Sequence, residues 1–291
     1  MYHILRNQLV YEFSPEARPV LTLDPGDHVT IETYDATTGR IHRPEDLPAY
    51  LAIRDPRKVN PASGPIFVRG AQAGDELAVT IERISLAERG FVRAMPGGPI
   101  LPDVEGPIAI MVTIDGDTLI YPGGLRWPAR PMVGVIGTAP ANGVVYTAYP
   151  GPQGSNLDCN AIRVGAKVHL PVHVPGALFA LGDVHASMGD GEVSGTGVEI
   201  NGEVQVKIEL LAGQAHDRPW VEVDGSIVAT GSAPDTQQAI TIAVDGLTRL
   251  LGERYQVSRT EAFMLISARG DVRIGQCCGG LDATAYATFA M

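Results

Sequence analysis

Residues 182–199 read Gly-Asp-Val-His-Ala-Ser-Met-Gly-Asp-Gly-Glu-Val-Ser-Gly-Thr-Gly-Val-Glu and follow the apolar run 176–181. The stretch holds two aspartates, two glutamates and one histidine among five glycines. Glycine disfavours a helix and permits tight turns or a close approach to a ligand. Several carboxylates beside one imidazole repel one another unless a cation lies among them, and this donor set suits a divalent metal. We therefore predict a loop that carries a metal site; the alternative is a solvated acidic turn between two strands.

The composition indicates a folded soluble protein, because 45% of the 291 residues are hydrophobic and 19% are charged. The net charge of −11 argues against nucleic acid as a partner, since phosphates are bound by positive charge. No apolar run reaches the roughly 20 residues of a membrane span, so no membrane partner is expected. The start shows no signal peptide, and Cys159, Cys277 and Cys278 form no disulfide framework, so we expect a cytoplasmic protein.

The pattern of turns predicts a mainly β fold with an α+β C-terminal part. Glycine (34) and proline (22) are frequent while aromatics make up only 6%, which suits many short strands joined by turns. Turn signals recur at a pace typical of a sandwich or barrel. We expect a β-sandwich or jelly-roll-like region over residues 1–200, with a small β-barrel inserted at about 91–150. Residues 201–291 are expected to be α+β, with helices that begin near Asp235 and Thr260 and a strand from Asp271.

Residues 28–35 alternate in polarity as a strand does, with Val29 and Ile31 on one face. His28 lies on the opposite face, and Asp35 ends the strand. A polar face of this kind is either exposed to solvent or lines a cleft. In the second case, His28 and Asp35 reach a metal.

Two further segments carry polar side chains. The loop 151–160 holds Asn156 and Asp158, which fall on one side of an extended backbone. His169 and His173 are four residues apart, a spacing that shares a face only on a helix, whereas the β-branched neighbours and Pro171 predict a strand. We therefore interpret the two histidines as structural.

The loops 154–160 and 182–199, together with the first strand, supply a candidate site. Zinc is expected for low coordination, and magnesium, manganese or calcium for an oxygen-rich shell. A carboxylate outside the ligand set can act as a general base. Serine-triad and nucleotide-binding schemes are not indicated, because the chain lacks G-x-S-x-G and Walker A motifs. The candidate residues are Asn156, Asp158, Asp183, His185, Asp190, Glu192 and Glu199, with His28 and Asp35.

At these residues the chain resembles the acetamidase/formamidase family, whose long motif reads G-D-x-H-A-x-Q-G-D-G-E-x-x-G-T-x-x-E. Residues 182–199 match this motif nearly throughout, and shorter matches extend over most of the chain. The shorter matches are 25–36, 63–75, 131–137, 154–158 and 262–267.

The resemblance implies a metal-dependent hydrolase that splits the C–N bond of short amides, linear or cyclic, into carboxylate and ammonia, within a homo-oligomer. Zinc is the expected ion, with calcium or magnesium as a second ion. Glu192 is expected to transfer protons or act as a further ligand, Asn156 to hydrogen-bond the substrate, and Asp183 to assist catalysis. The implied metal ligands are His28, Asp35, Asp158, His185 and Glu199.

The chain departs from the family pattern at three points: Met188 replaces Gln, Ser155 replaces Gly, and the tail 277–280 reads Cys-Cys-Gly-Gly. Met188 removes an amide side chain beside the predicted site, so we expect an altered substrate range. Two alternatives stay open: a β-sandwich binding module whose acidic loop holds a structural calcium, and a cysteine amidase in which Cys159 is the nucleophile and His185 its base.

Overall fold

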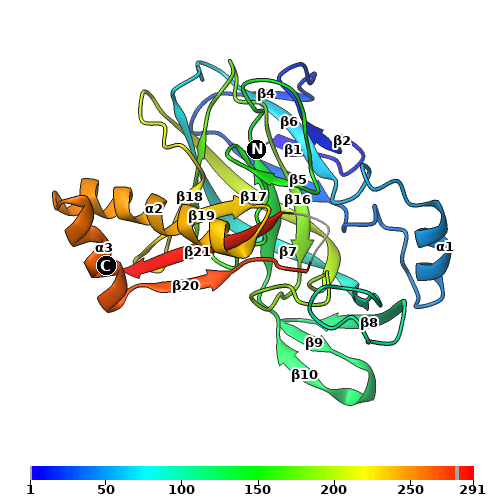
Figure 1. Ribbon diagram of the computed structural model, residues 1–291. Coiled ribbons are helices and arrows are strands. Elements are labelled where there is room, and N and C mark those ends of the chain that lie inside the picture. The colour runs from blue at the N-terminus through cyan, green and yellow to red at the C-terminus, as the bar shows by residue number, and fades with distance from the viewer. Residues whose placement is uncertain (1, 279–281) are drawn as a thin grey trace.

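The computed structural model describes residues 2–278 and 282–291, so Gly279 and Gly280 of the atypical tail lie outside the described residues. The described residues form a large curled, mostly antiparallel sheet with helices at its margins (Figure 1). The first-half strands are β1 (Tyr2–Ile4), β2 (Leu9–Val10), β3 (Glu12–Phe13), β4 (Leu21–Leu23), β5 (His28–Thr33), β6 (Ala62–Val68), β7 (Glu76–Ala94), β8 (Ile108–Asp115), β9 (Thr118–Ile120), β10 (Arg126–Pro128) and β11 (Met132–Gly137). The second-half strands are β12 (Val145–Tyr146), β13 (Pro150–Gly151), β14 (Gly154–Asn156), β15 (Lys167–Pro171), β16 (Phe179–His185), β17 (Glu199–Leu211), β18 (Trp220–Val223), β19 (Ser226–Ala233), β20 (Asp271–Ile274) and β21 (Ala283–Ala290). The helices are α1 (Asp46–Ile53), α2 (Thr236–Tyr255) and α3 (Arg259–Arg269), with a 3-10 turn at Pro122–Gly124.

This architecture confirms the predicted mainly β class but does not confirm the sandwich or the inserted barrel. Apart from the separate pair β3–β12, the described strands belong to one hydrogen-bonded network. Strands β8, β9 and β10 form an antiparallel ribbon that projects from the end of β7 (Figure 1), whereas β11 returns to the core and pairs with β14 and β16. The expected boundary at residue 200 falls inside β17, and the division into two regions stays a prediction.

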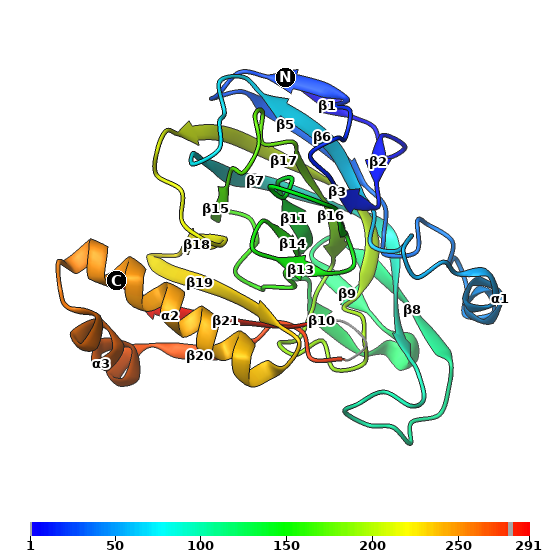
Figure 2. The ribbon, with the colours of Figure 1, turned by 45° about the horizontal axis from the view of Figure 1, so that its top comes forward.

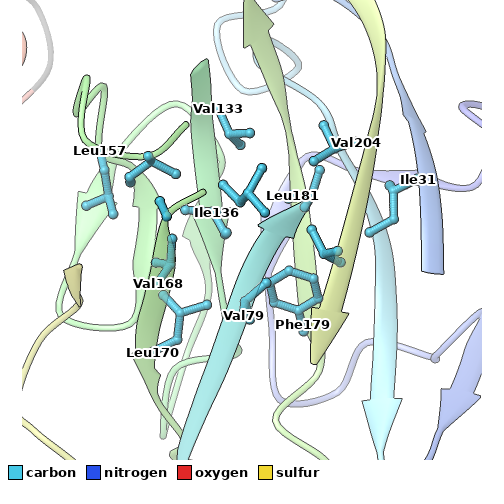
Figure 3. Close-up of a cluster of buried hydrophobic side chains, with 14 of the residues drawn as sticks. Ile31, Val79, Val133, Ile136, Leu157, Val168, Leu170, Phe179, Leu181 and Val204 are labelled. Carbon is cyan, nitrogen blue, oxygen red and sulfur yellow. The ribbon is translucent and has the colours of Figure 1, made fainter. Parts of the chain in front are cut away.

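The centre of the sheet is the pairing of the long strands β7 and β17. Along β17, Val204, Val206 and Ile208 are fully buried while the residues between them are partly exposed, as the two-residue period of a strand dictates. Figure 3 shows Val204 beside Leu181 of β16, and Val79 of β7 beside Phe179, in the main cluster of buried apolar side chains. This core fixes the strand ends from which the polar loops extend.

The C-terminal helices begin where the sequence predicts. The Asp235 side chain accepts a hydrogen bond from the Gln238 backbone and caps α2, and Ser258 with Glu261 forms a capping box at α3. Helix α2 lies across β19 and β21 (Figure 2) and buries Ala239, Ala243, Leu247 and Leu251 against them. None of the helices in residues 2–278 and 282–291 has the length and apolar character needed to cross a bilayer.

Candidate active site

The site forms where β16 ends and β17 begins. His185, the last residue of β16, faces Glu199, the first residue of β17, across an antiparallel ladder. Residues 186–198 form the loop between them, so the two ends of the glycine-rich stretch meet in space. Strand β11 lies between β14 and β16, and this order brings Asp158, just after β14, towards Asp183 in β16.

The side chains of this cluster are buried and close together. His185 Nε2 lies 3.2 Å from Glu199 Oε1 and 3.8 Å from Asp183 Oδ1, and His185 Nδ1 lies 4.0 Å from Asp158 Oδ1. None of these four side chains is more than 2% exposed. Two groups could hold an ion: Asp158, Asp183 and His185, and His185, Glu192 and Glu199, with ligand atoms in each group within 4.8 Å of one another.

Several of these buried atoms have no hydrogen-bond partner among the described residues. They are both ring nitrogens of His185, Oδ1 of Asp158 and Oδ1 of Asp183. His185 Nε2 and Glu199 Oε1 approach closely, but not with the alignment that a hydrogen bond requires. Buried polar atoms are nearly always satisfied, so this set of atoms fits ligands arranged around a cation.

Burial dominates the electrostatics of the cluster. Burial raises the pKa of Asp158 to about 6 and the pKa of Glu192 to about 8. Burial and the charge of Glu199 raise the pKa of Asp183 well above its usual range. Burial alone would lower the pKa of His185, but the adjacent carboxylates hold it well above its ordinary value. Burial alone would likewise raise the pKa of Glu199, but the neighbouring His185 holds the pKa of Glu199 below its ordinary value. The positive charge of one imidazolium does not balance the negative charge of four buried carboxylates, so either bound protons or a cation must neutralise the remainder.

The backbone of the cluster adopts unusual conformations. Asp158, Asp183 and Glu192 have φ values of 44°, 53° and 45°, in the left-handed region that non-glycine residues avoid. Gly134 of β11 is required between two of them, because a Cβ there would lie 2.6 Å from Asp158 Oδ1 and 2.9 Å from the Asp183 carbonyl oxygen. Strained residues gathered around a buried cluster indicate a functional site.

A cavity of about 550 Å³ opens onto the cluster at Glu192 and Glu199. Glu192 Oε1 accepts a hydrogen bond of 2.9 Å from the Gly197 N–H, and the Cys278 thiol lies 3.7 Å from Glu192 Oε2. Asn156 also lines the cavity. Its Oδ1 accepts from Asn60 Nδ2 at 3.3 Å, and its Nδ2 donates to the Ala148 carbonyl at 3.3 Å. The structure thus brings the predicted Asn156 and Glu192 to one cavity.

Asp35 lies beside the cluster but binds its own loop. Its Oδ1 accepts hydrogen bonds from the Thr37 N–H (2.8 Å), the Thr37 hydroxyl (2.6 Å) and the Gly39 N–H (3.0 Å). The adjacent Ala36 N–H donates to Glu199 Oε2 at 3.2 Å. Asp35 is therefore placed to hold the loop that supports Glu199.

His28 is not brought to the cluster, which corrects its place in the expected ligand set. Its ring is 41% exposed, and Nδ1 lies 3.0 Å from Glu82 Oε2. Asp35 follows His28 by seven residue steps, roughly 23 Å of extended chain at about 3.3 Å per residue. Because Asp35 lies beside Glu199, His28 lies at the far end of β5.

Other predicted candidates have structural surroundings. Asp190 accepts from Asn160 Nδ2 at 2.7 Å and pairs with Arg273 at 3.3 Å, which ties the loop to the C-terminal strands. His169 lies in β15, as expected for a strand, and contacts the buried Glu76. Burial raises the pKa of Cys159 to about 12, the opposite of what a thiolate nucleophile requires.

Met188 packs inside the loop rather than at the cavity. Met188 is 2% exposed. A Cβ added to Gly197 would lie 3.1 Å from the Met188 Cβ and 2.9 Å from the His185 ring. Sequence reasoning did not identify Tyr50, Arg93 and the loop 95–104, which also line the cavity. They belong to segments without a chemical motif, and only the fold brings them together.

The chain is similar in sequence and fold to proteins named acetamidase. The acetamidase from Bacillus halodurans has a similar structure, with a TM-score of 0.92 and 35% identity over 99% of this chain and 97% of that chain. The acetamidase from Yersinia enterocolitica superposes with a TM-score of 0.91 and 29% identity over 99% and 91% of the two chains. An acetamidase from Mycolicibacterium smegmatis is 25% identical over 270 residues, which cover 68% of this chain and 65% of that protein.

The chain spans 61–65% of the length of the curated relatives that it matches. The sequence profile described as the acetamidase/formamidase family matches residues 5–148 and 141–276, which together cover most of the chain. The long motif at residues 182–199 lies within the matched segment 141–276. The chain therefore belongs to the acetamidase/formamidase family.

Proposed function

We propose that this protein hydrolyses the C–N bond of primary amides to carboxylate and ammonia, with a divalent cation held by the cluster around His185. The observation that carries the proposal is the set of buried potential ligand atoms on His185, Asp158 and Asp183 that have no hydrogen-bond partner in the part of the chain that the structure describes. Relatives named acetamidase and formamidase support the reaction class.

The donor set fits a metal ion. Imidazole nitrogen with carboxylate oxygens suits zinc, and the surplus of carboxylates leaves room for calcium or magnesium as a second ion. Asp158, Asp183, His185 and Glu199 are the residues that would hold the ion. A cation bound there supplies Lewis acidity, which polarises an amide carbonyl and lowers the pKa of water.

Glu192 is the residue best placed to move the proton. Its Oε1 is fixed by the Gly197 N–H, and the side chain lines the cavity. Burial raises its pKa to about 8, which lies near the operating range of a general acid and base. In hydrolysis, Glu192 takes a proton from the attacking water and returns it to the amide nitrogen as the C–N bond breaks. Asn156, at the cavity wall, is placed to orient the substrate.

Substitution of Glu192 tests these roles. Glu192→Gln is expected to keep the metal, measured by elemental analysis, and to lower kcat for ammonia release by about 10²–10⁴-fold. His185→Ala is expected to lose both metal and activity. His28→Ala is the matched control and is expected to keep both, because His28 lies away from the cluster.

These variants, together with chelation of the parent protein, distinguish the rival interpretations. Full activity of Glu192→Gln would contradict its role in proton transfer. If chelation lowers only the stability of the protein, the cluster is a structural calcium site in a binding module. Homo-oligomeric assembly and a cytoplasmic location stay predictions; sedimentation velocity of the purified chain measures the first.

A further inference from the structure

The cavity beside Glu192 is much larger than formamide or acetamide. Its volume is about 550 Å³, whereas a water molecule in the liquid takes about 30 Å³. Cavities of about 300–1,000 Å³ are typical of drug-sized ligands. A substrate the size of a few water molecules would leave most of the space to solvent.

Part of the cavity wall is apolar and incompletely covered. Ile100 and Leu101, from the loop between β7 and β8, line it and are 43% and 62% exposed. Val193, from the loop between β16 and β17, lines it and is 60% exposed. Large exposed apolar side chains gathered at one cavity indicate contact with an apolar part of a ligand.

Two arginines line the same cavity. Arg93 of β7 is half-buried; its backbone N–H donates to Thr196 Oγ1 at 3.1 Å, and its Nη2 donates to the Gly195 carbonyl oxygen at 3.5 Å. Arg54 follows the last residue of α1. Tyr50 lines the cavity as well, so Arg54, Arg93 and the Tyr50 hydroxyl group belong to residues of one cavity wall.

Neither arginine forms an ion pair with a carboxylate of residues 2–278 and 282–291, although the protein carries a net charge of −11. A guanidinium without a carboxylate partner in a cavity wall recognises planar anions, above all carboxylates, through paired N–H donors. The buried carboxylates at the cluster would repel such an anion. The negative group of a ligand must therefore lie at the arginines and away from Glu192.

Resting on the proposed amide hydrolysis, we propose that the preferred substrates are monoamides of dicarboxylic acids: primary amides whose acyl chain ends in a carboxylate. The amide lies at the cluster, the methylenes pack along Ile100 and Leu101, and the carboxylate pairs with Arg93 and Arg54. Water adds its oxygen to the carbonyl carbon, the C–N bond breaks, and the products are the dicarboxylate and ammonium. Arg93 and Arg54 determine specificity.

Two matched series of amides test the proposal with the metal-loaded enzyme. One series is neutral, from acetamide to longer aliphatic amides; the other has the same number of methylenes and a terminal carboxylate. We expect kcat/KM to rise about fourfold for each buried methylene until the cavity is filled. At the best length, the carboxylated amide is expected to exceed its neutral counterpart at least tenfold, and higher ionic strength is expected to reduce this preference.

Variants assign the preference to the arginines. Arg93→Gln and Arg54→Gln are each expected to lower the ratio of carboxylated to neutral kcat/KM at least tenfold, and Arg93→Lys to lower it less. Arg126→Gln, an exposed arginine of β10, is the matched control and is expected to leave the ratio unchanged.

Two outcomes are distinguishable. Equal kcat/KM for the two series at every length, or acetamide as the best substrate, overturns the inference and leaves amide hydrolysis standing. Absence of ammonia release from every amide in both series contradicts the proposed function itself. The salt dependence of the ratio tests the ionic contact even if Arg93→Gln does not fold.

Discussion

His185 Nε2 and Glu199 Oε1 lie 3.2 Å apart across the β16–β17 ladder without the alignment of a hydrogen bond. Asp183, in the same strand as His185, has its Oδ1 3.8 Å from the same His185 nitrogen. Strand register alone sets this approach, because His185 and Glu199 are direct cross-strand partners. The pair therefore defines the centre of the site.

Gly134→Ala is expected to disrupt the cluster. The added Cβ would lie 2.6 Å from Asp158 Oδ1, so the Asp158 side chain must shift from its present position. Overpacking of this kind costs about 1–3 kcal/mol of stability, and we expect metal content to fall with it. Gly189→Ala is the control, because a Cβ there meets no atom within 4 Å. Thermal unfolding and elemental analysis measure both effects; unchanged metal content in Gly134→Ala would argue that Asp158 is not a ligand.

Two substitutions of Asp35 distinguish a role in holding its loop from a role as a metal ligand. Asp35→Asn keeps an oxygen that accepts from Thr37 and Gly39, and we expect it to retain metal and most activity. Asp35→Ala leaves these buried donors unpaired and is expected to cost about 1–3 kcal/mol of stability, with loss of kcat as Glu199 loses its support from Ala36. Loss of metal in Asp35→Asn would instead place Asp35 among the ligands.

Glu76 gives the protein a pH-dependent stability far from the site. Burial alone would raise the pKa of Glu76, but hydrogen bonds of 2.7 Å from His169 and His216 lower it to about 2, from an ordinary value of 4.5. Because the folded pKa is depressed, the carboxylate contributes stability above about pH 4.5, and this contribution is lost as pH falls towards 2. Its magnitude is on the order of 2–3 kcal/mol.

Urea unfolding from pH 7 to pH 3 measures this contribution. Glu76→Gln is expected to be less stable than the parent at pH 7. The difference in the free energy of unfolding between the two proteins is expected to narrow as pH falls below 4.5. Glu88→Gln, an exposed glutamate of the same strand, is the control. Glu76 also raises the pKa of His216, so the contribution of His216 is present below its ordinary pKa and is lost as pH rises through the raised value. A gap that is constant with pH would show that Glu76 is not held as a carboxylate.

Cys159 is expected to be dispensable for catalysis. It is 1% exposed and packs in the main core, where its thiol stays protonated. Cys159→Ser and Cys159→Ala should therefore keep kcat/KM within a few-fold of the parent value, apart from modest losses of stability. If Cys159→Ser folds but releases no ammonia, the alternative interpretation as a cysteine amidase would be supported instead.

Much of the site could be predicted because its chemistry is local in the sequence. Residues 182–199 carry His185, Glu192 and Glu199 within one short stretch of sequence, and glycines mark the turns of the loop between the two strands. The C-terminal helices were also predictable, since Asp235 and Ser258 supply capping signals and the apolar spacing of α2 is regular. These features depend on neighbouring residues only.

The remainder depends on long-range pairing, which no local pattern specifies. His28 and Asp35 belong to the same polar pattern, yet the length of the strand carries them to different places. The residues 39–60 show no regular alternation in the sequence, yet they contain the short helix α1, in which Leu47 and Tyr50 are the buried residues. The return of β11 between β14 and β16 sets the distance from Asp158 to Asp183, and no motif encodes that order.

The most direct test of the central claim is ammonia release from a primary amide before chelation, after chelation and after return of a divalent cation, with metal content measured in each state. If the cluster around His185 holds a catalytic ion, activity falls in proportion to the metal removed and returns when zinc is added back. The His185→Ala variant is expected to have neither metal nor activity in any of the three states. Full turnover by protein that has lost its metal would contradict the claim.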